Sequence, residues 1–561
     1  MRCERHILAE HRWRQAFPLV LILCLVLVQQ IPGSLGQSAT FDEVYKVSTG
    51  YSFLRTGKMR WTRDHPPLIR QLTASPLLLL NPQLPQGVDN KGDFAHRFFF
   101  ENTINPDMML FLARLPIIGL TLLLICGIYS WARELWGHRA GRLAAFVAAL
   151  DPNLIAHGQL ATNDLGVACF FFLTIYAFWC FLRRPSKRRL VMTGLMAGLA
   201  LASKFSAAVV VPLLSSLGFF HLTGAVAEGV RRDGRWLLVR LFIICLIAMI
   251  VLVIDYGGEL RSIWEMAVEM QSMGQADIAP PDAGPVIDFI LTRLPIPAPS
   301  YWYGLWLVGS DVQVGRPTFM WGQHLKTGQW YYFPVVLFIK TPLATLILIG
   351  VTLIGLLRSG ASGWRDALFL ALPVGVWMGA AMLSKLTLGY RYVLPAWPFL
   401  FVMVGRVLAV PSTGWKRVLL LALLGWLAVG AVMIFPHPLA YFNELVGGPE
   451  EGYRYLVDSN LDWGQDLKRL ARYQREHALG KIYLAYFGTA DPDYYGIEYE
   501  CMPSYGWLAC ADAPTPHSGT LAVSATCLQG GCTEDPAVYR WLLDEEPIAK
   551  IGYSIFIYSL P

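Results

Sequence analysis

Long apolar stretches alternate with polar segments up to residue 435, and this pattern dominates the chain. An α-helix needs about 20 mostly apolar residues to cross a bilayer, where its backbone groups must bond to one another. The pattern therefore predicts a polytopic α-helical membrane protein with about 11 transmembrane helices. The apolar stretches are 17–31, 110–132, 143–158, 165–182, 190–202, 205–222, 237–255, 333–357, 366–383, 392–410 and 418–435.

Clusters of Arg and Lys lie in several of the polar segments and set the expected orientation of the helices. Because short loops rich in these residues stay on the cytoplasmic side of a membrane, two crossings must separate one basic loop from the next. This rule divides the apolar run 190–222 at Ser203-Lys204, and it places the N-terminus inside. The segments expected outside are 32–109, 151–164, 203–206, 256–332, 384–391 and 436–561.

Residues 17–31 allow a second interpretation. Basic Arg12 and Arg14 precede this stretch and small residues follow it, as in a secretory signal peptide. Cleavage there would remove one span and leave the later topology unchanged, so both interpretations stay open.

The last segment, 436–561, is polar enough to form a small extracytoplasmic domain beside the transmembrane domain of residues 1–435. A helix is expected at about 463–478, because Asp462 and Gln465 have the spacing of a capping box. Three short segments with strand-like composition complete a predicted α/β domain. These segments are 481–487, 520–525 and 548–558.

Four cysteines of this domain predict disulfides. The outer compartment is oxidising, so two disulfides are expected. Four cysteines allow three connectivities, and the sequence leaves all three open. The cysteines are Cys501, Cys510, Cys527 and Cys532.

The composition agrees with a membrane protein, since 55% of the residues are hydrophobic, 15% are charged and the mean hydropathy is +0.43. The net charge of +6 does not indicate a nucleic-acid partner, because most basic clusters lie between spans, where they orient the chain. The chain has no Gly-rich phosphate loop and no zinc-type Cys/His spacing. Membrane lipid is therefore the expected surrounding of this protein.

Ionisable residues near the predicted spans gather on the outer side. Acidic residues beside a span are costly unless they have a function or face water, and Asp42-Glu43 directly follows the first apolar stretch. A carboxylate at this place can take a proton from a hydroxyl group. The other ionisable residues on this side are Asp64, His65, His157, Asp164, Lys204, His324, Lys385 and Arg391.

Five short motifs in a fixed order carry a resemblance to a known family. Together they resemble the polyprenyl-phosphate-dependent glycosyltransferases of the GT-C fold, in the style of protein O-mannosyltransferases and lipid A aminoarabinose transferases. The resemblance covers most of residues 10–435, and Val457–Leu467 is similar to bacterial members that carry an outer C-terminal domain. The motifs are Asp42-Glu43, His65–Leu68, Ala161–Asp164, Ala202–Ser206 and Gly389–Pro395.

The resemblance implies an enzyme that moves one sugar, mannose-like or a modified pentose, from a polyprenyl-phosphate donor. The acceptor would be a hydroxyl group of a protein, lipid or glycan at the outer face of a bacterial plasma membrane. The lipid phosphate leaves with negative charge, so the site needs cations near it. The attacking hydroxyl needs a base within hydrogen-bond reach, and direct displacement would invert the sugar carbon.

Carried over to this chain, the resemblance makes Asp42 the general base and gives Glu43 a share of that role. Asp164 matches the second acidic residue of the family. Lys204 and Arg391 are candidates for binding the lipid phosphate. The motifs identify no cofactor, and a divalent metal, with His65 as one ligand, stays a hypothesis. His65 alternatively orients its loop, because two prolines follow it.

Each of these residues also has a purely structural interpretation. Asp42 and Asp164 each precede a predicted helix and could cap it. Lys204 and Arg391 could extend along the membrane surface with their charged ends in water. Arg114 lies four residues into its own span, where the same behaviour is expected, so it is left out of the predicted site.

Two other functions remain open at this point. A ligase of the same fold would transfer a preassembled glycan from a lipid diphosphate, and it would need more cations than Lys204 and Arg391. A non-enzymatic transporter of lipid-linked sugars is the other alternative. Transporters place ionisable residues near the bilayer midplane, often in repeated halves, whereas these residues gather at one surface and no repeat is visible.

Overall fold

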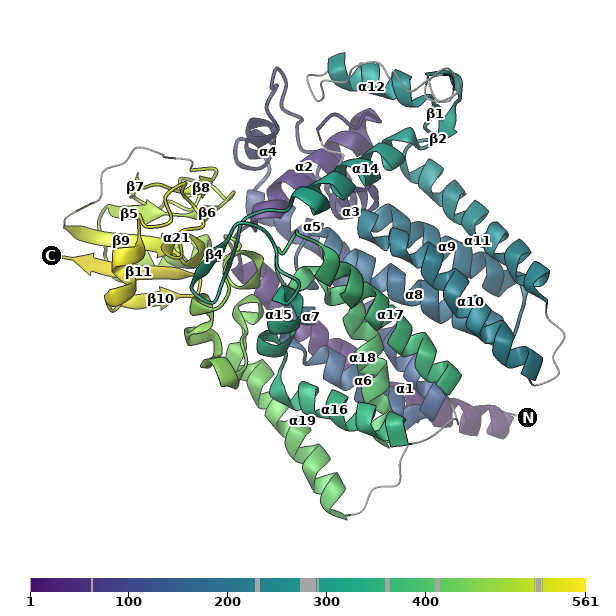
Figure 1. Ribbon diagram of the computed structural model, residues 1–561. Helices are drawn as coiled ribbons and strands as arrows, with labels where there is room; N and C mark the ends of the chain where they lie inside the picture. The colour runs from purple at the N-terminus through teal and green to yellow at the C-terminus, as the bar shows by residue number, and fades with distance from the viewer. Residues whose placement is uncertain are drawn as a thin grey trace.

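The computed structural model describes residues 2–61, 64–227, 233–272, 289, 292–358, 364–408, 414–508, 510, 516 and 518–561. Long helices form a bundle, and a domain that contains a β-sheet lies at one end of it, beside α2 and α4 (Figure 1). The N-terminus of the chain lies at the other end of the bundle.

Seven helices of the described chain are long and apolar enough to cross a membrane, which confirms the prediction of a mostly helical membrane protein. Each of them contains one predicted apolar stretch. The first is the Gln15–Gly36 part of α1 (Arg2–Gly36). The others are α5 (Pro106–Trp136), α8 (Asn163–Arg183), the run Phe205–Thr223, which ends inside α10 (Val210–Ala227), α11 (Gly234–Asp255), α17 (Trp364–Leu383) and α19 (Gly414–Ile434).

The predicted span 333–357 is not one straight helix. The structure has α15 (Tyr332–Lys340) and α16 (Leu343–Arg358), which meet at an angle of 112°. Pro342 explains the break, because proline donates no backbone hydrogen bond and disfavours helical geometry in the residue before it.

The predicted span 143–158 also consists of two pieces, α6 (His138–Ala149) and α7 (Pro152–His157). The side chain of Asp151 accepts a hydrogen bond from the N–H of Leu154 at 2.9 Å and so starts the second piece. Two further predicted spans are short helices, α9 (Lys187–Ser203) and the run Leu394–Leu408 that contains α18 (Trp397–Val404).

The predicted division at Ser203-Lys204 is confirmed. Helix α9 ends at Ser203, and Lys204 is extended, with φ −161° and ψ 140°. A 3-10 turn, η2 (Phe205–Val209), then leads into α10.

Three helices fold within the first outer segment, and they are α2 (Phe41–Thr56), α3 (Leu68–Ala74) and α4 (Lys91–Phe100). Helices α2 and α3 pack closely at Gly50, where a Cβ atom would lie 2.2 Å from the carbonyl oxygen of Arg70. The predicted outer segment 256–332 contains α12 (Ile263–Ser272), α14 (Pro299–Val314) and the hairpin of β3 (Thr318–Met320) and β4 (Gln323–Leu325).

The C-terminal domain contains a five-stranded sheet in the order β10-β11-β9-β5-β7. Strands β10, β11 and β9 are antiparallel neighbours, whereas β5 is parallel to both β9 and β7. Two of the predicted strand segments are confirmed as single strands of this sheet, and the segment 548–558 folds back on itself as β10 and β11. The strands are β5 (Ile482–Ala485), β7 (Tyr499–Cys501), β9 (Gly519–Ser524), β10 (Ala549–Ile551) and β11 (Ile555–Leu560).

The predicted helix at 463–478 is shorter than expected, because α20 covers Leu467–Glu476. Gln465 does not cap it. Its side chain instead accepts from the N–H of Trp463 and donates to the carbonyl of Leu461.

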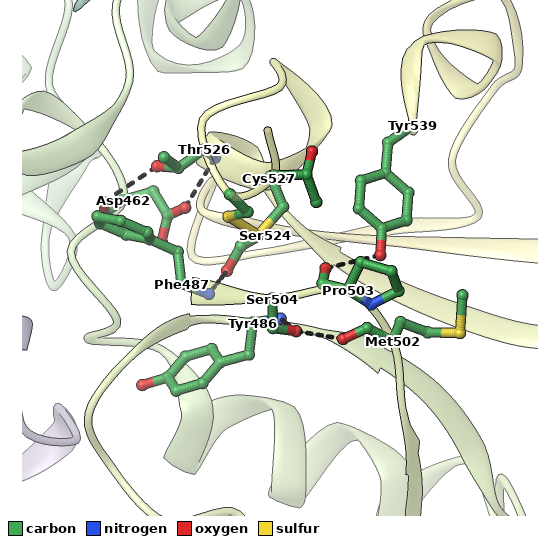
Figure 2. Close-up of a disulfide and its surroundings, with 12 residues drawn as sticks. Asp462, Tyr486, Phe487, Met502, Pro503, Ser504, Ser524, Thr526, Cys527 and Tyr539 are labelled. Atoms are coloured by element: carbon green, nitrogen blue, oxygen red, sulfur yellow. Dashed lines mark hydrogen bonds between the residues drawn. A yellow bond between two sulfur atoms is a disulfide. The ribbon is translucent and has the colours of Figure 1, made fainter. Parts of the chain in front are cut away.

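Both disulfides are present, and each joins neighbours in the sequence. They are Cys501–Cys510 and Cys527–Cys532. Figure 2 shows one disulfide close to Asp462 and Thr526.

Candidate active site

A cavity of about 340 Å³ lies at the end of the bundle where α2 and α3 meet the transmembrane helices. The polar part of its lining comes mainly from the predicted outer segments. The apolar part includes residues of α8, η2, α14 and α17. Four of the six predicted site residues line this cavity, namely Asp42, His65, Lys204 and Arg391.

Asp42 lies in the first turn of α2. Thr40 caps this helix and exchanges hydrogen bonds with Glu43 in a capping box, so Asp42 is not the cap. A carboxylate is favourable here, because backbone N–H groups give the start of a helix partial positive charge. One turn later, Lys46 places its Nζ atom 2.8 Å from Oδ2 of Asp42.

Arg391 reaches the same carboxylate from the other side of the cavity. It lies in a short turn, η3 (Tyr390–Tyr392), and its Nη1 atom is 2.9 Å from Oδ2 of Asp42. The same nitrogen is 4.0 Å from Oδ2 of Asp164. The side chain of Arg391 is 11% exposed, so it does not extend into water as the structural interpretation required.

Asp164 and Lys204 form a second ion pair behind the first. The Nζ atom of Lys204 lies 2.7 Å from Oδ1 of Asp164, whose side chain is 1% exposed. Asp164 follows the cap residue of α8, which is Thr162, so capping does not explain it. The ammonium group of Lys204 also lies 4.4 Å from the ring centre of Tyr392.

Asp42 pairs with both Lys46 and Arg391, and Asp164 pairs with Lys204, so three cations surround two carboxylates and this cluster has an excess of positive charge. Burial alone would raise the pKa of Asp42, but the charges of Lys46 and Arg391 outweigh burial and hold the pKa of this carboxyl well below its usual range. Asp42 is therefore ionised at neutral pH, as a base must be. The positive charge that the two carboxylates do not neutralise can attract a bound anion.

His65 lines the cavity next to Asp64, and its Nδ1 atom is 3.3 Å from Oδ2 of that residue. Burial lowers the pKa of the His65 imidazole to about 4, although the Asp64 carboxylate opposes this. The ring is therefore neutral at physiological pH. Pro66 and Pro67 follow it and lead directly into α3.

Glu43 lies outside the cavity and is fully buried. Its carboxylate accepts from Nε and Nη2 of Arg114 at 2.8 and 2.6 Å and from the N–H groups of Thr40 and Ala161 at 2.9 and 2.7 Å. The prediction that Arg114 extends into water at the membrane surface is wrong. Its guanidinium instead pairs with Glu43 and donates to the carbonyls of Ser34 and Ser38 at 2.6 and 2.9 Å.

Sequence reasoning missed several residues that contact this cluster. Lys46 could have been found, because a helix brings positions four apart onto one face. Lys91 and Arg316 line the cavity but come from segments without a recognised motif. Trp463 was quoted as part of a motif, yet its contact with Arg391, 4.4 Å from the guanidinium carbon to the ring centre, depends on the tertiary fold.

Within the part of the chain that the structure describes, no group of three or more His, Cys, Asp or Glu side chains is arranged to hold a metal ion. His157, one of the outer histidines, is buried with its ring edge-on to Trp463 at 6.4 Å. A metal at this site therefore stays a hypothesis.

Comparison with known protein families finds a match for one segment of the chain. Residues 107–254 match the family model described as dolichyl-phosphate-mannose-protein mannosyltransferase. This segment runs from α5 to α11 and contains Asp164 and Lys204. No curated protein matches the chain in sequence.

Several solved structures are similar to the chain. ArnT from Cupriavidus metallidurans bound to undecaprenyl phosphate has 12% identity and a TM-score of 0.49, over 97% of this chain and 98% of that one. The apo oligosaccharyltransferase of Archaeoglobus fulgidus has 14% identity and a TM-score of 0.48, over 83% of this chain and 58% of that one. The S. cerevisiae Pmt1-Pmt2 complex bound to the sugar donor has 18% identity and a TM-score of 0.35, over 46% and 34%.

The apolar helices and the family match define an integral-membrane glycosyltransferase. The match over residues 107–254 agrees with the lipid-linked-sugar glycosyltransferases that the sequence motifs resemble. The resemblance recognised from the sequence motifs is thereby confirmed.

Proposed function

We propose that this enzyme transfers a single sugar from a polyprenyl-phosphate donor to an acceptor hydroxyl, with Asp42 as the general base. The observation that carries this proposal is the convergence of Asp42, Arg391 and Lys204 at one cavity whose lining is also partly apolar. The sugar would be mannose-like or a modified pentose, and the acceptor would be a protein, a lipid or a glycan.

The reaction needs three events at the anomeric carbon of the donor sugar. Asp42 takes the proton of the acceptor hydroxyl, and the acceptor oxygen forms a bond to that carbon. The bond from the carbon to the phosphate oxygen breaks, and the electron pair leaves with the polyprenyl phosphate. Because attack and departure take place on opposite faces, the configuration of the sugar carbon is inverted.

The charges of the cluster fit the leaving group. Lys204 and Arg391 belong to the polar part of the cavity lining, and they could share their charge between their carboxylate partners and an incoming phosphate. Preorganised cations stabilise the negative charge that develops as the phosphate leaves. This role needs no nucleotide-binding motif, which agrees with the absence of a Gly-rich phosphate loop from the sequence.

The apolar part of the cavity lining fits a polyprenyl chain. Side chains from three membrane-spanning elements contribute to it, so a lipid could enter from the bilayer without crossing water. The apolar lining includes Val167 of α8, Phe205 and Val209 of η2, and Trp377, Ala380 and Ala381 of α17.

Purified protein with a radiolabelled polyprenyl-monophosphate sugar tests this proposal. General-base catalysis contributes about 100- to 10,000-fold to a rate, so Asp42→Asn should lower kcat by a factor in that range while the donor still binds. Asp89→Asn is the matched control, because Asp89 belongs to the same outer segment and its side chain is 98% exposed. Full activity of Asp42→Asn would refute the role of Asp42.

Two further cations support a second candidate function, the transfer of a preassembled glycan from a lipid diphosphate. Lys91 and Arg316 line the cavity, and among the described residues no carboxylate forms an ion pair with either of them within 4.0 Å. They supply the additional charge that a lipid-diphosphate donor would need. Equal amounts of monophosphate and diphosphate donors, offered in the same assay, decide between single-sugar transfer and glycan ligation.

We also propose that the site faces the outer side of a bacterial plasma membrane, with the N-terminus in the cytoplasm. The positions of the basic loops support this orientation. Cysteines introduced at exposed Glu450 and exposed Arg184 can be labelled from each side of sealed vesicles. Labelling of the first only from outside, and of the second only from inside, is the expected result.

A further inference from the structure

The stretch from residue 458 to residue 466, named here the 458–466 segment, runs from the C-terminal domain into the end of the bundle that holds the cavity. Residues 459–466 are all buried. The segment contributes no side chain to the cavity lining. It nevertheless contacts both residues of the ion pair between Asp42 and Arg391, or their immediate neighbours.

The first contact is with Arg391. The guanidinium carbon lies 4.4 Å from the ring centre of Trp463, whose side chain is 1% exposed. A cation on the face of an indole ring is attracted to it, more strongly where water is excluded. One residue earlier in η3, the N–H of Tyr390 donates to the side chain of Asn460 at 3.0 Å. The segment therefore holds both the backbone and the charged end of this turn.

The second contact is with the start of α2. The carbonyl of Trp463 accepts the N–H of Phe41 at 2.8 Å, and Phe41 directly precedes Asp42. The first N–H groups of a helix have no partner within the helix, so an outside acceptor fixes how the helix begins. Ser38 adds two bonds, from its N–H to the carbonyl of Gln465 at 3.0 Å and from its hydroxyl to the carbonyl of Gly464 at 2.9 Å.

The segment itself is held rigidly in this place. Gly464 has φ +86°, and a Cβ atom there would lie 2.8 Å from the hydroxyl oxygen of Tyr486, so only glycine fits. Asp462 accepts the N–H of Thr526 at 2.8 Å, next to the Cys527–Cys532 disulfide, as Figure 2 shows. The C-terminal domain thus anchors the residue whose ring lies against Arg391.

We propose that Trp463 is a positioning residue that sets the distance between Asp42 and Arg391, through its indole face on one side and its main-chain carbonyl on the other. The inference rests on the proposed roles of these two residues. This role of Trp463 makes the C-terminal domain part of the catalytic unit. Small displacements of reacting groups, about 1 Å, can cost about 100-fold in rate, so the contact matters although Trp463 touches no substrate.

The test compares Trp463→Leu, Trp463→Phe and the wild-type protein in the full chain. The main-chain bond to Phe41 is kept in both variants, so they report on the ring alone. Trp463→Leu should lower kcat/KM for the lipid donor by about 10- to 100-fold. Trp463→Phe keeps an aromatic face and should recover most of this loss.

A second measurement separates positioning from a merely structural role. In the Arg391→Gln background, Trp463→Leu should lower kcat/KM by less than about 2-fold, because its effect passes through Arg391. If the losses of the two single variants multiply in the double variant, the proposal is overturned. If Trp463→Leu does not fold, the same cycle with Trp463→Met, which also lacks the aromatic face, gives the answer.

Trp131→Phe is the matched control for loss of packing. Trp131 is fully buried in the bundle and contacts Phe172 and Phe399, away from the cavity. Its substitution should lower thermal stability without a change in kcat/KM per folded molecule. Failure of the wild-type protein to use any polyprenyl-monophosphate donor would refute the proposed function instead, and wild-type kinetics in Trp463→Leu would refute only the role of Trp463.

Discussion

The Nη1 atom of Arg391 lies 2.9 Å from Oδ2 of Asp42, although 349 positions separate these residues in the chain. Asp42 lies at the start of α2, and Arg391 lies in the turn between α17 and α18. The ion pair therefore exists only in the folded protein. Each of its members sets the electrostatic surroundings of the other, and this coupling can be measured.

The first prediction concerns the pH dependence of transfer. The charges that face Asp42 are Lys46, Arg391 and, when protonated, His65, and together they hold the pKa of Asp42 well below its usual range. Activity falls as pH drops through the pKa of the base, so the wild-type protein should stay active in mild acid. Arg391→Gln and Lys46→Met should each raise the pKa of Asp42 and move the acidic limb of kcat/KM to higher pH.

His65→Gln provides a contrast in the same pH titration. The pKa of His65 is about 4, so its ring is already neutral above pH ~5 and removing it changes no charge there. Below pH ~4 the wild-type ring is charged and helps to lower the pKa of Asp42, so its loss should move the acidic limb slightly to higher pH while the profile above pH ~5 stays unchanged. A limb near pH 6 that disappears in His65→Gln would show that His65, and not Asp42, controls the pH dependence.

The second prediction concerns Lys204. Lys204→Met leaves Asp164, 1% exposed, without its nearest cation, and breaking a buried ion pair costs about 3–5 kcal/mol. The loss should appear as a lower unfolding temperature in detergent. The double variant Lys204→Met with Asp164→Leu should recover part of this stability, whereas the KM for the donor should stay raised in both. Equal KM values in all three proteins would remove Lys204 from the donor site.

The third prediction concerns Glu43 and Arg114, which pair in complete burial. Glu43→Gln and Arg114→Met should each lower the free energy of unfolding by about 3–5 kcal/mol. Activity per folded molecule should change by less than about 3-fold, because neither side chain lines the cavity. The matched control is Arg60→Met, whose exposed pair with Asp89 should contribute less than about 1 kcal/mol. A large fall of kcat in stable Glu43→Gln would instead support a catalytic share for Glu43.

The fourth prediction concerns the stability of the C-terminal domain. Burial raises the pKa of Asp462 to about 7, above its value of about 3.9 in an unfolded chain. Between these pH values the folded state holds a proton that the unfolded state releases, so wild-type stability should fall as pH rises from about 4 to about 7. Asp462→Asn keeps an acceptor for the N–H of Thr526 and should remove this dependence of stability on pH. At neutral pH the variant should therefore be more stable than the wild-type protein, by at most about 4 kcal/mol. Thermal unfolding of both proteins at several pH values checks this.

The sequence was informative where local chemistry decides the structure. Apolar stretches predicted the long helices, the basic loops predicted the break at Lys204, and segments of strand-like composition predicted the strands of the C-terminal sheet. These features depend on nearby residues or on one simple rule about charge. Lys46 was not predicted, although it follows from the same local rule, because one helical turn brings it to Asp42.

The features that the sequence did not predict depend on contacts between segments that are distant in the chain. Arg114 has the sequence surroundings of a residue at the membrane edge, but the carboxylate that binds it is 71 positions away. The bend between α15 and α16 brings Lys340 to the carbonyl of Leu439 at 2.9 Å and to the carbonyl of Asn460. No periodic pattern encodes such a pair, because only the packed bundle brings the two groups together.

The 458–466 segment has a consequence for the biosynthesis of the enzyme. Among the described residues, the last helix long and apolar enough to cross the membrane ends at Ile434, whereas Asn460 and Trp463 follow it in the chain. A ribosome that has just completed this helix has already produced Asp42, Asp164, Lys204 and Arg391. The nascent chain nevertheless lacks the segment that fixes their arrangement. With the proposed roles of these residues, competence for transfer is reached late, once the segment that follows the last of these helices has been made and folded.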